Sequence, residues 1–205
     1  MQLLVLGASG KTGTALVAQG LERGHGVTAF GRSAYGGRSH DALRIVPGSC
    51  LSADDLAAAL PGHDAVVSAL GTRGIGATTL LRDSAVAAAD ALTRAGVIRL
   101  IVISSTLVDG ASWLARVAAR TLLRHHTRDQ RAMEKVVGQS DLDWTIVRAP
   151  RLSNGTPIDR FMLRNDPPSD LPASISRSDL ARLMLEAVEH GSHLKQIVSV
   201  ARTQS

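Results

Sequence analysis

Short apolar segments alternate with amphipathic ones along the whole chain. Residues 2–6 (QLLVL) end at a glycine, and residues 14–23 then have helical periodicity up to Gly24. The segments DAVVSAL at 64–70 and RLIVISS at 99–105 are almost continuously apolar, as is typical of strands buried on both faces of a parallel sheet. The pattern therefore predicts repeated strand–helix units.

The rest of the chain continues this alternation. Further strands are expected at 27–30, 43–46, 143–150 and about 196–200, and further helices at 51–60, about 78–95, 113–137 and 176–190. We expect the longest helix to be kinked or broken near His125. The segment 151–175 is rich in Pro, Asn and Asp, which indicates a loop-built cap. Residues 1–205 are thus predicted to form a single Rossmann-type, doubly wound α/β domain with a small C-terminal cap on the substrate side.

Three glycines separate the first predicted strand from the first predicted helix. In GASGKTG, Gly7 permits a tight turn, Gly10 lets the backbone approach a pyrophosphate, and Gly13 allows close packing of helix and strand. The N-terminus of the helix then offers backbone N–H groups to the phosphates, with further donors nearby on Ser9, Lys11 and Thr12. The alternative is a glycine turn that binds no nucleotide, which we consider the weaker interpretation.

The second predicted strand ends without an acidic residue. In NAD-specific sites an acidic residue about 20 positions downstream binds the ribose 2′-hydroxyl, whereas this chain has Gly31, Arg32 and Ser33 there. A guanidinium binds a 2′-phosphate through paired, charge-assisted hydrogen bonds, and Arg38 adds a second positive group. We therefore expect NADP(H) rather than NAD(H), the alternative being that Arg32 is a solvated loop residue.

Composition narrows the range of partners. The net charge is +5, but the chain has only two Trp, two Phe and one Tyr, and it lacks the dense basic stripe or the stacking aromatics of nucleic-acid binders. No apolar stretch approaches the ~20 residues that cross a bilayer, and the N-terminal residues do not resemble a signal peptide. Cys50 is the single cysteine, so no disulfide or multi-cysteine metal site forms within the chain. We expect a cytoplasmic protein without nucleic-acid, membrane or metal partners.

Several motifs, taken in order, carry a family resemblance. They are GASGKTG at 7–13, GRS at 31–33, HDAVVSALGTRG at 63–74, GVIRLIVISST at 96–106, SDLDWTIVRAP at 140–150 and ISRSDLARLML at 175–185. Together they resemble the atypical short-chain dehydrogenase/reductase group that contains the NmrA-like proteins, and most closely its flavin reductase (biliverdin reductase B) branch. The resemblance spans nearly the whole chain, and the joint order of the motifs is more specific than any one of them.

This resemblance implies the remainder of the site. It brings Leu70, Gly71, Thr72 and Arg73 beside the ribose and nicotinamide, Ser104 and Ser105 to the nicotinamide, and Pro150, Arg151 and Leu152 to its other side. All of them follow the carboxyl ends of predicted strands, where open α/β sheets bind ligands. Ser105 and Ser104 are therefore the candidate catalytic residues, the alternative being that their hydroxyls cap a strand end.

The chain departs from the family at three positions. Gly48 and Ser49 stand where the family has Gly-Asp near the adenine, which leaves adenine recognition to the backbone or to Ser49. Gln130 stands where related proteins carry His or Lys in the second half of the long helix. Arg151 follows a single proline where the reductase has a histidine beyond a proline pair. The last two departures affect the substrate side.

The chain also lacks the catalytic Tyr-Lys pair of classical short-chain dehydrogenases. Its only tyrosine is Tyr35, and the residue four positions later is Ser39. Hydride transfer needs no such pair when a conjugated acceptor takes the hydride and then a proton from solvent. We therefore prefer an NADPH-dependent reductase of a small flavin-, quinone- or tetrapyrrole-like molecule, acting as a monomer or weak homodimer. An NADP(H)-sensing regulator of the NmrA type, without turnover, and a biosynthetic epimerase or isomerase stay open.

Other charged residues yield weaker candidates. His125 and His126 are the remaining acid–base groups, with Asp129 and Glu134 close in sequence. Their spacing matches no metal or relay pattern, so we interpret the histidines as surface or hinge residues rather than catalytic ones. A stripe of arginines is interpreted as a solvated helix face, with an anion site as the alternative: Arg116, Arg120 and Arg124.

Overall fold

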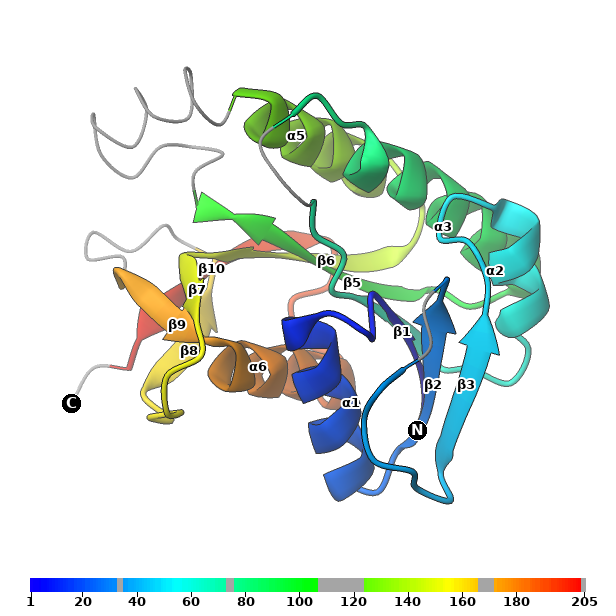
Figure 1. Ribbon diagram of the computed structural model, residues 1–205. Helices are drawn as coiled ribbons and strands as arrows, with labels where there is room; N and C mark the ends of the chain where they lie inside the picture. The colour runs from blue at the N-terminus through cyan, green and yellow to red at the C-terminus, as the bar shows by residue number, and fades with distance from the viewer. Residues whose placement is uncertain (33–34, 73–75, 107–123, 166–171, 204–205) are drawn as a thin grey trace.

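A computed structural model describes residues 1–32, 35–72, 76–106, 124–165 and 172–203 (Figure 1). Its main strands are β1 (Gln2–Leu6), β2 (Gly26–Gly31), β3 (Leu43–Pro47), β4 (Ala65–Ser68), β5 (Arg99–Ser105), β6 (Asp143–Ala149), β8 (Phe161–Arg164) and β10 (Gln196–Arg202). They form one sheet in the order β3-β2-β1-β4-β5-β6-β10-β8. All neighbours are parallel except β8 and β10. This order confirms the predicted doubly wound sheet.

Helices cover both faces of the sheet (Figure 1). On one face lie α1 (Lys11–Glu22) and α6 (Arg177–Glu189), which pack against each other. On the other lie α2 (Ala53–Ala59), α3 (Leu80–Ala95) and α5 (Arg124–Gly138). The first half of the long helix expected at 113–137 lies largely outside the described residues, as do Arg116 and Arg120. Among the described residues, no helix is both long and apolar enough to cross a membrane.

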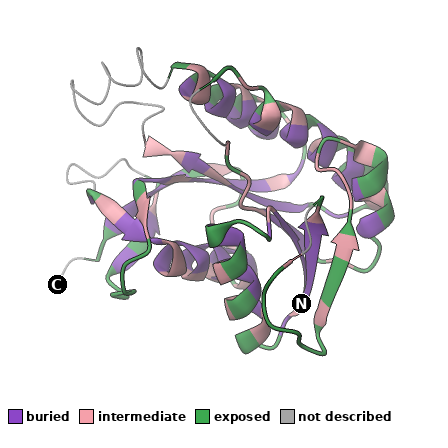
Figure 2. Cartoon of the chain, in the orientation of Figure 1, coloured by how far each residue is buried: buried purple, intermediate pink, exposed green. Residues whose placement is uncertain are grey.

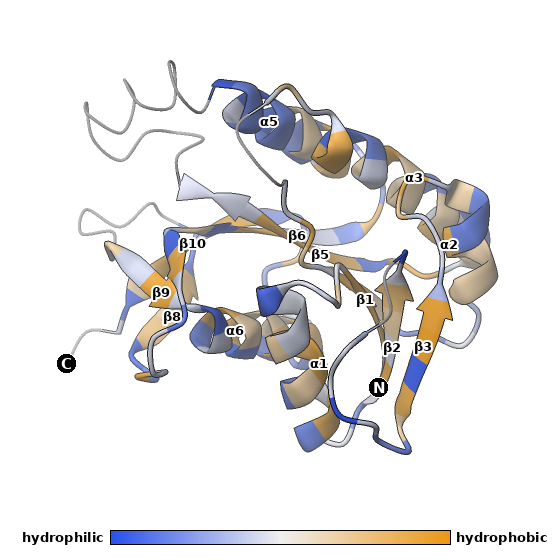
Figure 3. Ribbon diagram, in the orientation of Figure 1, coloured by the Kyte–Doolittle hydropathy of each residue, from blue (hydrophilic) through white to orange (hydrophobic). Residues whose placement is uncertain are grey.

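Two apolar clusters fill the space between the sheet and its two layers of helices (Figure 2). Leu3 and Val5 of β1 belong to the cluster under α1 and α6, whereas Leu4 and Leu6 belong to the cluster under α3 and α5. Successive side chains of a strand point to opposite faces, so a strand covered on both faces is apolar at every position. Figure 3 shows the resulting contrast between the hydrophobic central strands and the hydrophilic outer surface of α5.

The segment 151–175 differs from the loop-built cap that its composition predicted. It contributes β8 to the edge of the main sheet, antiparallel to β10. Two more strands, β7 (Arg151–Ser153) and β9 (Ser174–Ser176), pair in a small parallel sheet of their own. Strands of three or four residues separated by prolines are too short for a period-two pattern to be visible. The cap is therefore held to the domain by strand pairing.

Candidate active site

The turn after β1 is shaped by two of its glycines. Gly7 has a φ of +74°, and a Cβ there would lie 2.9 Å from the carbonyl oxygen of Ala69. A Cβ on Gly13 would overlap with the carbonyl oxygen of Gly7 and with the backbone of Ala8. Glycine is therefore required at both positions, at the first by backbone conformation and at the second by the close approach of α1 to the turn.

Helix α1 begins with unpaired donors. Its N-cap is Gly10, which provides no side-chain cap, and its first turn contains no acidic residue. The first N–H groups of a helix have no partner within it, and the helix dipole adds partial positive charge at this end. The Lys11 side chain is exposed beside them. This end of α1 is suited to a phosphate group.

A cleft of ≈ 1000 Å³ runs from α1 along the carboxyl ends of the central strands to α5 and the cap. Its walls come from the N-terminus of α1, from the residues after β4, β5 and β6, from α5, and from the segment around β7 and β9. Most sequence-predicted site residues line it, namely Gly10, Lys11, Thr12, Leu70, Gly71, Thr72, Ser104, Ser105, Pro150, Arg151 and Leu152. The fold thus brings together residues that the sequence placed at four separate strand ends.

The predicted adenosine side lies apart from these cleft walls. Arg32 is exposed directly after β2. Burial raises the pKa of the Cys50 thiol, and the positive charge of Arg32 partly opposes that rise, so the guanidinium lies near the chain after β3. Ser49 donates its N–H to the carboxylate of Asp55 at 2.8 Å, and its hydroxyl accepts a hydrogen bond from the N–H of Leu51 at 3.3 Å. Local structure therefore already uses part of the hydrogen-bonding capacity of Ser49.

Three further predicted residues are not among the described residues that line the cleft. Ser9 is exposed in the glycine turn and does not contribute to the walls of the cleft. Ser33 and Arg73 lie outside the described residues. The predicted part of the cleft wall therefore consists of the residues named above.

His126 lies in the wall of the cleft, a position that the spacing of the histidines in the sequence did not predict. Its Nδ1 is 2.7 Å from Oγ1 of Thr72, which follows β4. Burial lowers the pKa of His126, and the nearby charge of Asp129 opposes this only in part. His125 contacts Arg124 and does not line the cleft. Adjacent histidines look alike in sequence, and only the packing of α5 decides which one faces the ligand.

The two acidic residues near the histidines hold α5 in place. The carboxylate of Asp129 accepts hydrogen bonds from the N–H groups of Leu81 and Arg82, each at 3.0 Å. These N–H groups belong to the first turn of α3, whose own N-cap residue makes no side-chain cap. Glu134 forms a two-point ion pair with Arg148 on β6, with distances of 2.9 and 2.7 Å. Both pairs fix the face of α5 that borders the cleft.

Two buried polar side chains of the cleft each have an oxygen without a hydrogen-bond partner among the described residues. Ser104 is 2% exposed and Gln130 is 5% exposed, and neither Oγ of Ser104 nor Oε1 of Gln130 makes a hydrogen bond. Buried polar groups are hydrogen-bonded in most proteins, and exceptions often mark sites of function. Both residues line the cleft, Ser104 from β5 and Gln130 from α5, and the part of the wall between these elements is called the polar corner.

The cap adds positive charge to the opposite wall. Arg151 is exposed at the start of β7, and Arg177, at the start of α6, donates a hydrogen bond to the side chain of Asn154 at 2.6 Å. No sequence pattern indicated that Arg177, or the neighbouring Pro172 and Ala173, would line the cleft. Their position depends on the pairing of β7 with β9.

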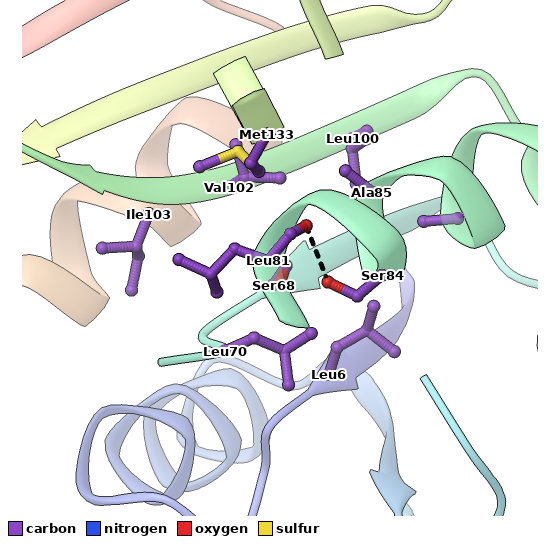
Figure 4. A pocket seen from close by; sticks show the side chains of 11 residues that line it. Leu6, Ser68, Leu70, Leu81, Ser84, Ala85, Leu100, Val102, Ile103 and Met133 are labelled. Carbon is purple, nitrogen blue, oxygen red and sulfur yellow. Dashed lines mark hydrogen bonds between the residues drawn. The ribbon is translucent and has the colours of Figure 1, made fainter. Parts of the chain in front are cut away.

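An apolar layer separates the cleft from a small cavity beneath it. Leu70, Leu81 and Ile103 line both spaces (Figure 4). The cavity measures ≈ 20 Å³, which is room for about one water molecule, and the hydroxyl of Ser84 inside it donates to the carbonyl of Leu81 at 3.0 Å. A substrate-sized ligand therefore fits only the cleft above this layer.

These features suit a phosphate-bearing cofactor at one end of the cleft. One end offers phosphate-binding N–H groups, the middle offers an apolar floor, and the far corner offers polar groups. Among the described residues, no group of three or more His, Cys, Asp or Glu side chains is arranged to hold a metal ion. The site is that of a protein that binds an organic cofactor.

Comparison with known proteins identifies the family. The model of the NAD(P)H-binding family matches residues 7–191, and the chain belongs to this family. An uncharacterized chloroplastic protein of Arabidopsis thaliana is 29% identical over 225 residues, covering 100% of this chain and 78% of the relative. Because this family binds NAD(P)H, the match confirms the predicted class of cofactor, a nicotinamide dinucleotide.

Solved structures confirm the fold. A short-chain dehydrogenase/reductase (wide type) of Veillonella parvula DSM 2008, in complex with NADP, has a TM-score of 0.82 at 19% identity, covering 98% of this chain and 94% of the other. ChuY, an anaerobillin reductase of Escherichia coli O157:H7, has a TM-score of 0.78 at 20% identity, covering 100% and 98%. The predicted Rossmann-type, doubly wound α/β fold is therefore confirmed.

Proposed function

We propose that this protein is an NADPH-dependent reductase that transfers hydride to a conjugated acceptor, such as a flavin-, quinone- or tetrapyrrole-like molecule. The observation that carries the proposal is the ≈ 1000 Å³ cleft, which joins the phosphate-binding end of α1 to an apolar floor and a polar corner. A pyrophosphate at α1 leaves the nicotinamide near the ends of β4, β5 and β6. Space then remains toward α5 and the cap for a flat second molecule.

The residues around the cleft suit this cofactor. The turn that begins at Gly7 and the N–H groups after Gly10 would hold the pyrophosphate. Arg32, exposed at the end of β2, would bind the 2′-phosphate, which supports NADPH over NADH. The NADP found in the Veillonella structure agrees with this preference. When bound, the nicotinamide supplies the hydride, while the protein binds the two molecules and holds them in contact.

The side chains present favour a conjugated acceptor over a simple ketone. Tyr35, the only tyrosine of the chain, lies in the loop after β2 and does not line the cleft. A simple ketone needs an acid beside its oxygen during hydride transfer, whereas a conjugated ring delocalises the added charge and is protonated afterwards. The description of ChuY as an anaerobillin reductase supports an acceptor of the tetrapyrrole class.

NADPH oxidation tests this function. Purified protein mixed with NADPH should oxidise it only after FMN, menadione or biliverdin is added, and NADH should be oxidised more slowly at equal concentration. Tight NADPH binding without oxidation by any acceptor would contradict the reductase and would favour the NADP(H)-sensing regulator. Weak binding of both cofactors would contradict the whole assignment.

A further inference from the structure

The corner between β5 and α5 holds two polar atoms that the protein itself leaves unsatisfied. They are Oγ of Ser104 and Oε1 of Gln130, on side chains that are 2% and 5% exposed. A buried hydrogen-bonding atom without a partner destabilises the protein, and both residues contribute to the wall of the same cleft. A ligand that enters the cleft is the remaining source of partners.

Several neighbouring polar groups of this corner are already paired with one another or with α3 and β6. His126 and Thr72 contact each other at 2.7 Å. Asp129 accepts two N–H groups from α3, and Glu134 is paired with Arg148. Because the last two pairs anchor α5, Gln130 is presented from a fixed helix rather than from a loop.

The chemistry of the two atoms defines the ligand group that they fit. Oε1 of a glutamine only accepts hydrogen bonds, so it needs an N–H or O–H donor, while a serine hydroxyl can donate to a carbonyl. A cyclic amide or imide presents an N–H directly beside a C=O and satisfies both. A simple quinone presents carbonyls alone and leaves Oε1 of Gln130 unpaired. The apolar floor of Leu70, Leu81 and Ile103 suits the flat ring that carries such an edge.

We propose that Gln130 and Ser104 are specificity-determining residues that select acceptors with a cyclic amide or imide edge over acceptors with carbonyls alone. The inference rests on the proposed function, since it concerns the acceptor of the same cleft. A site that hydrogen-bonds a ligand N–H discriminates strongly against an analogue without it, because the protein's own buried group is then left unpaired.

A matched pair of flavins tests this selection. Lumiflavin carries an imide N–H that 3-methyllumiflavin replaces with N–CH₃. The protein, saturated with NADP⁺, should bind lumiflavin at least about 10-fold more tightly than its methylated analogue, as measured by flavin fluorescence. Gln130→Met keeps a side chain of similar length without hydrogen-bonding groups, and it should abolish this preference. Gln139→Met, at an exposed position just after α5, should retain it.

A second variant covers the other half of the corner. Ser104→Ala removes one hydroxyl and should weaken the binding of lumiflavin and of menadione alike, each several-fold, because both ligands offer that hydroxyl a carbonyl acceptor. Equal affinity of the unmodified protein for both flavins would overturn the inference, as would an undiminished preference in Gln130→Met. Weaker NADP⁺ binding by Gln130→Met, with its flavin preference intact, would assign Gln130 to the cofactor and overturn it too. Because binding is measured without turnover, failure of NADPH oxidation refutes the reductase function while a selective flavin affinity still supports this inference.

Discussion

The phosphate-binding turn and the polar corner at α5 lie at opposite ends of one cleft, and they are built in different ways. The turn comes from one short motif, GASGKTG, and uses backbone N–H groups together with the absence of side chains. The corner comes from segments far apart in sequence, which supply Thr72, Ser104 and Gln130. The turn therefore depends on local backbone geometry, whereas the corner depends on how α5 is anchored.

This difference predicts separable effects. Damage to the turn should abolish cofactor binding whatever the acceptor, because every reaction of the cleft needs the pyrophosphate in place. Damage to the anchor of α5 should change acceptor use while cofactor affinity is retained. Variants at the two ends therefore test whether cofactor binding and acceptor use are independent.

The largest effect is expected at the turn. Gly13→Val introduces a side chain where even a Cβ would overlap with the backbone of Gly7 and Ala8, so α1 has to move away from the turn. Such overpacking costs roughly 1–3 kcal/mol of unfolding free energy, or more, and NADPH affinity should fall at least about 100-fold as the phosphate-binding N–H groups move. Urea denaturation and calorimetric titration measure the two losses.

A glycine in open space is the control for this variant. Gly76→Ala places its Cβ where no atom lies within 4 Å, and it should change neither stability nor NADPH affinity. If Gly13→Val bound NADPH normally, close packing of α1 on the turn would not be needed for cofactor binding.

The next effect is expected at the anchor of α5. Asp129→Asn removes the charge and one of the two oxygens that accept N–H groups of α3, and it should lower the unfolding free energy by about 1.5–3 kcal/mol. Acceptor turnover should fall more than NADPH affinity, because α5 carries His126 and Gln130. Steady-state kinetics and calorimetry separate the two quantities.

Asp83→Asn is the matched control. Asp83 lies in the first turn of α3, the turn whose N–H groups Asp129 binds, but the Asp83 side chain is partly exposed. It should leave acceptor turnover unchanged. Parallel losses of turnover and NADPH affinity in Asp129→Asn would show that the two ends of the cleft are not independent.

The cofactor half of the site was more predictable from sequence than the acceptor half. Gly7 and Gly13 could be interpreted from spacing, because their roles follow from backbone geometry within one motif. The cleft positions of Ser104 and Pro150 followed from the rule that ligands bind at the carboxyl ends of parallel strands. The positions of His126 and Arg177 could not be predicted, because they depend on the side-chain partners of α5 and on the pairing of β7 with β9. The strands of the cap were likewise too short to leave a pattern.

A smaller and more selective effect is expected at the adenosine side. Arg32→Asp replaces a guanidinium with a carboxylate that repels a 2′-phosphate, so NADPH affinity should fall by about 1–3 kcal/mol, while NADH affinity changes much less. Arg44→Asp makes the same change of charge at an exposed position of β3 and should not discriminate between the cofactors. Equal weakening of NADPH and NADH in calorimetric titration would contradict the role of Arg32.

The smallest effect concerns the pH dependence of stability at the acceptor end. Burial lowers the pKa of His126 in the folded protein, whereas in the unfolded chain it titrates near ~6.5. Between these values the unfolded chain binds more protons, so the unfolding free energy contributed by this site falls as the pH is lowered below ~6.5. In His126→Gln the side chain does not titrate, so this variant should lose part of the acid sensitivity of the unfolding free energy. Urea denaturation between about pH 7.5 and about pH 5.5, the interval around the usual pKa of histidine, measures this loss.

His40→Gln is the control. It changes a histidine at an exposed position and should behave like the unmodified protein. An identical pH dependence of His126→Gln and the unmodified protein would show that His126 is as accessible to protons in the folded cleft as in the unfolded chain, and the corner at α5 would then be open to solvent.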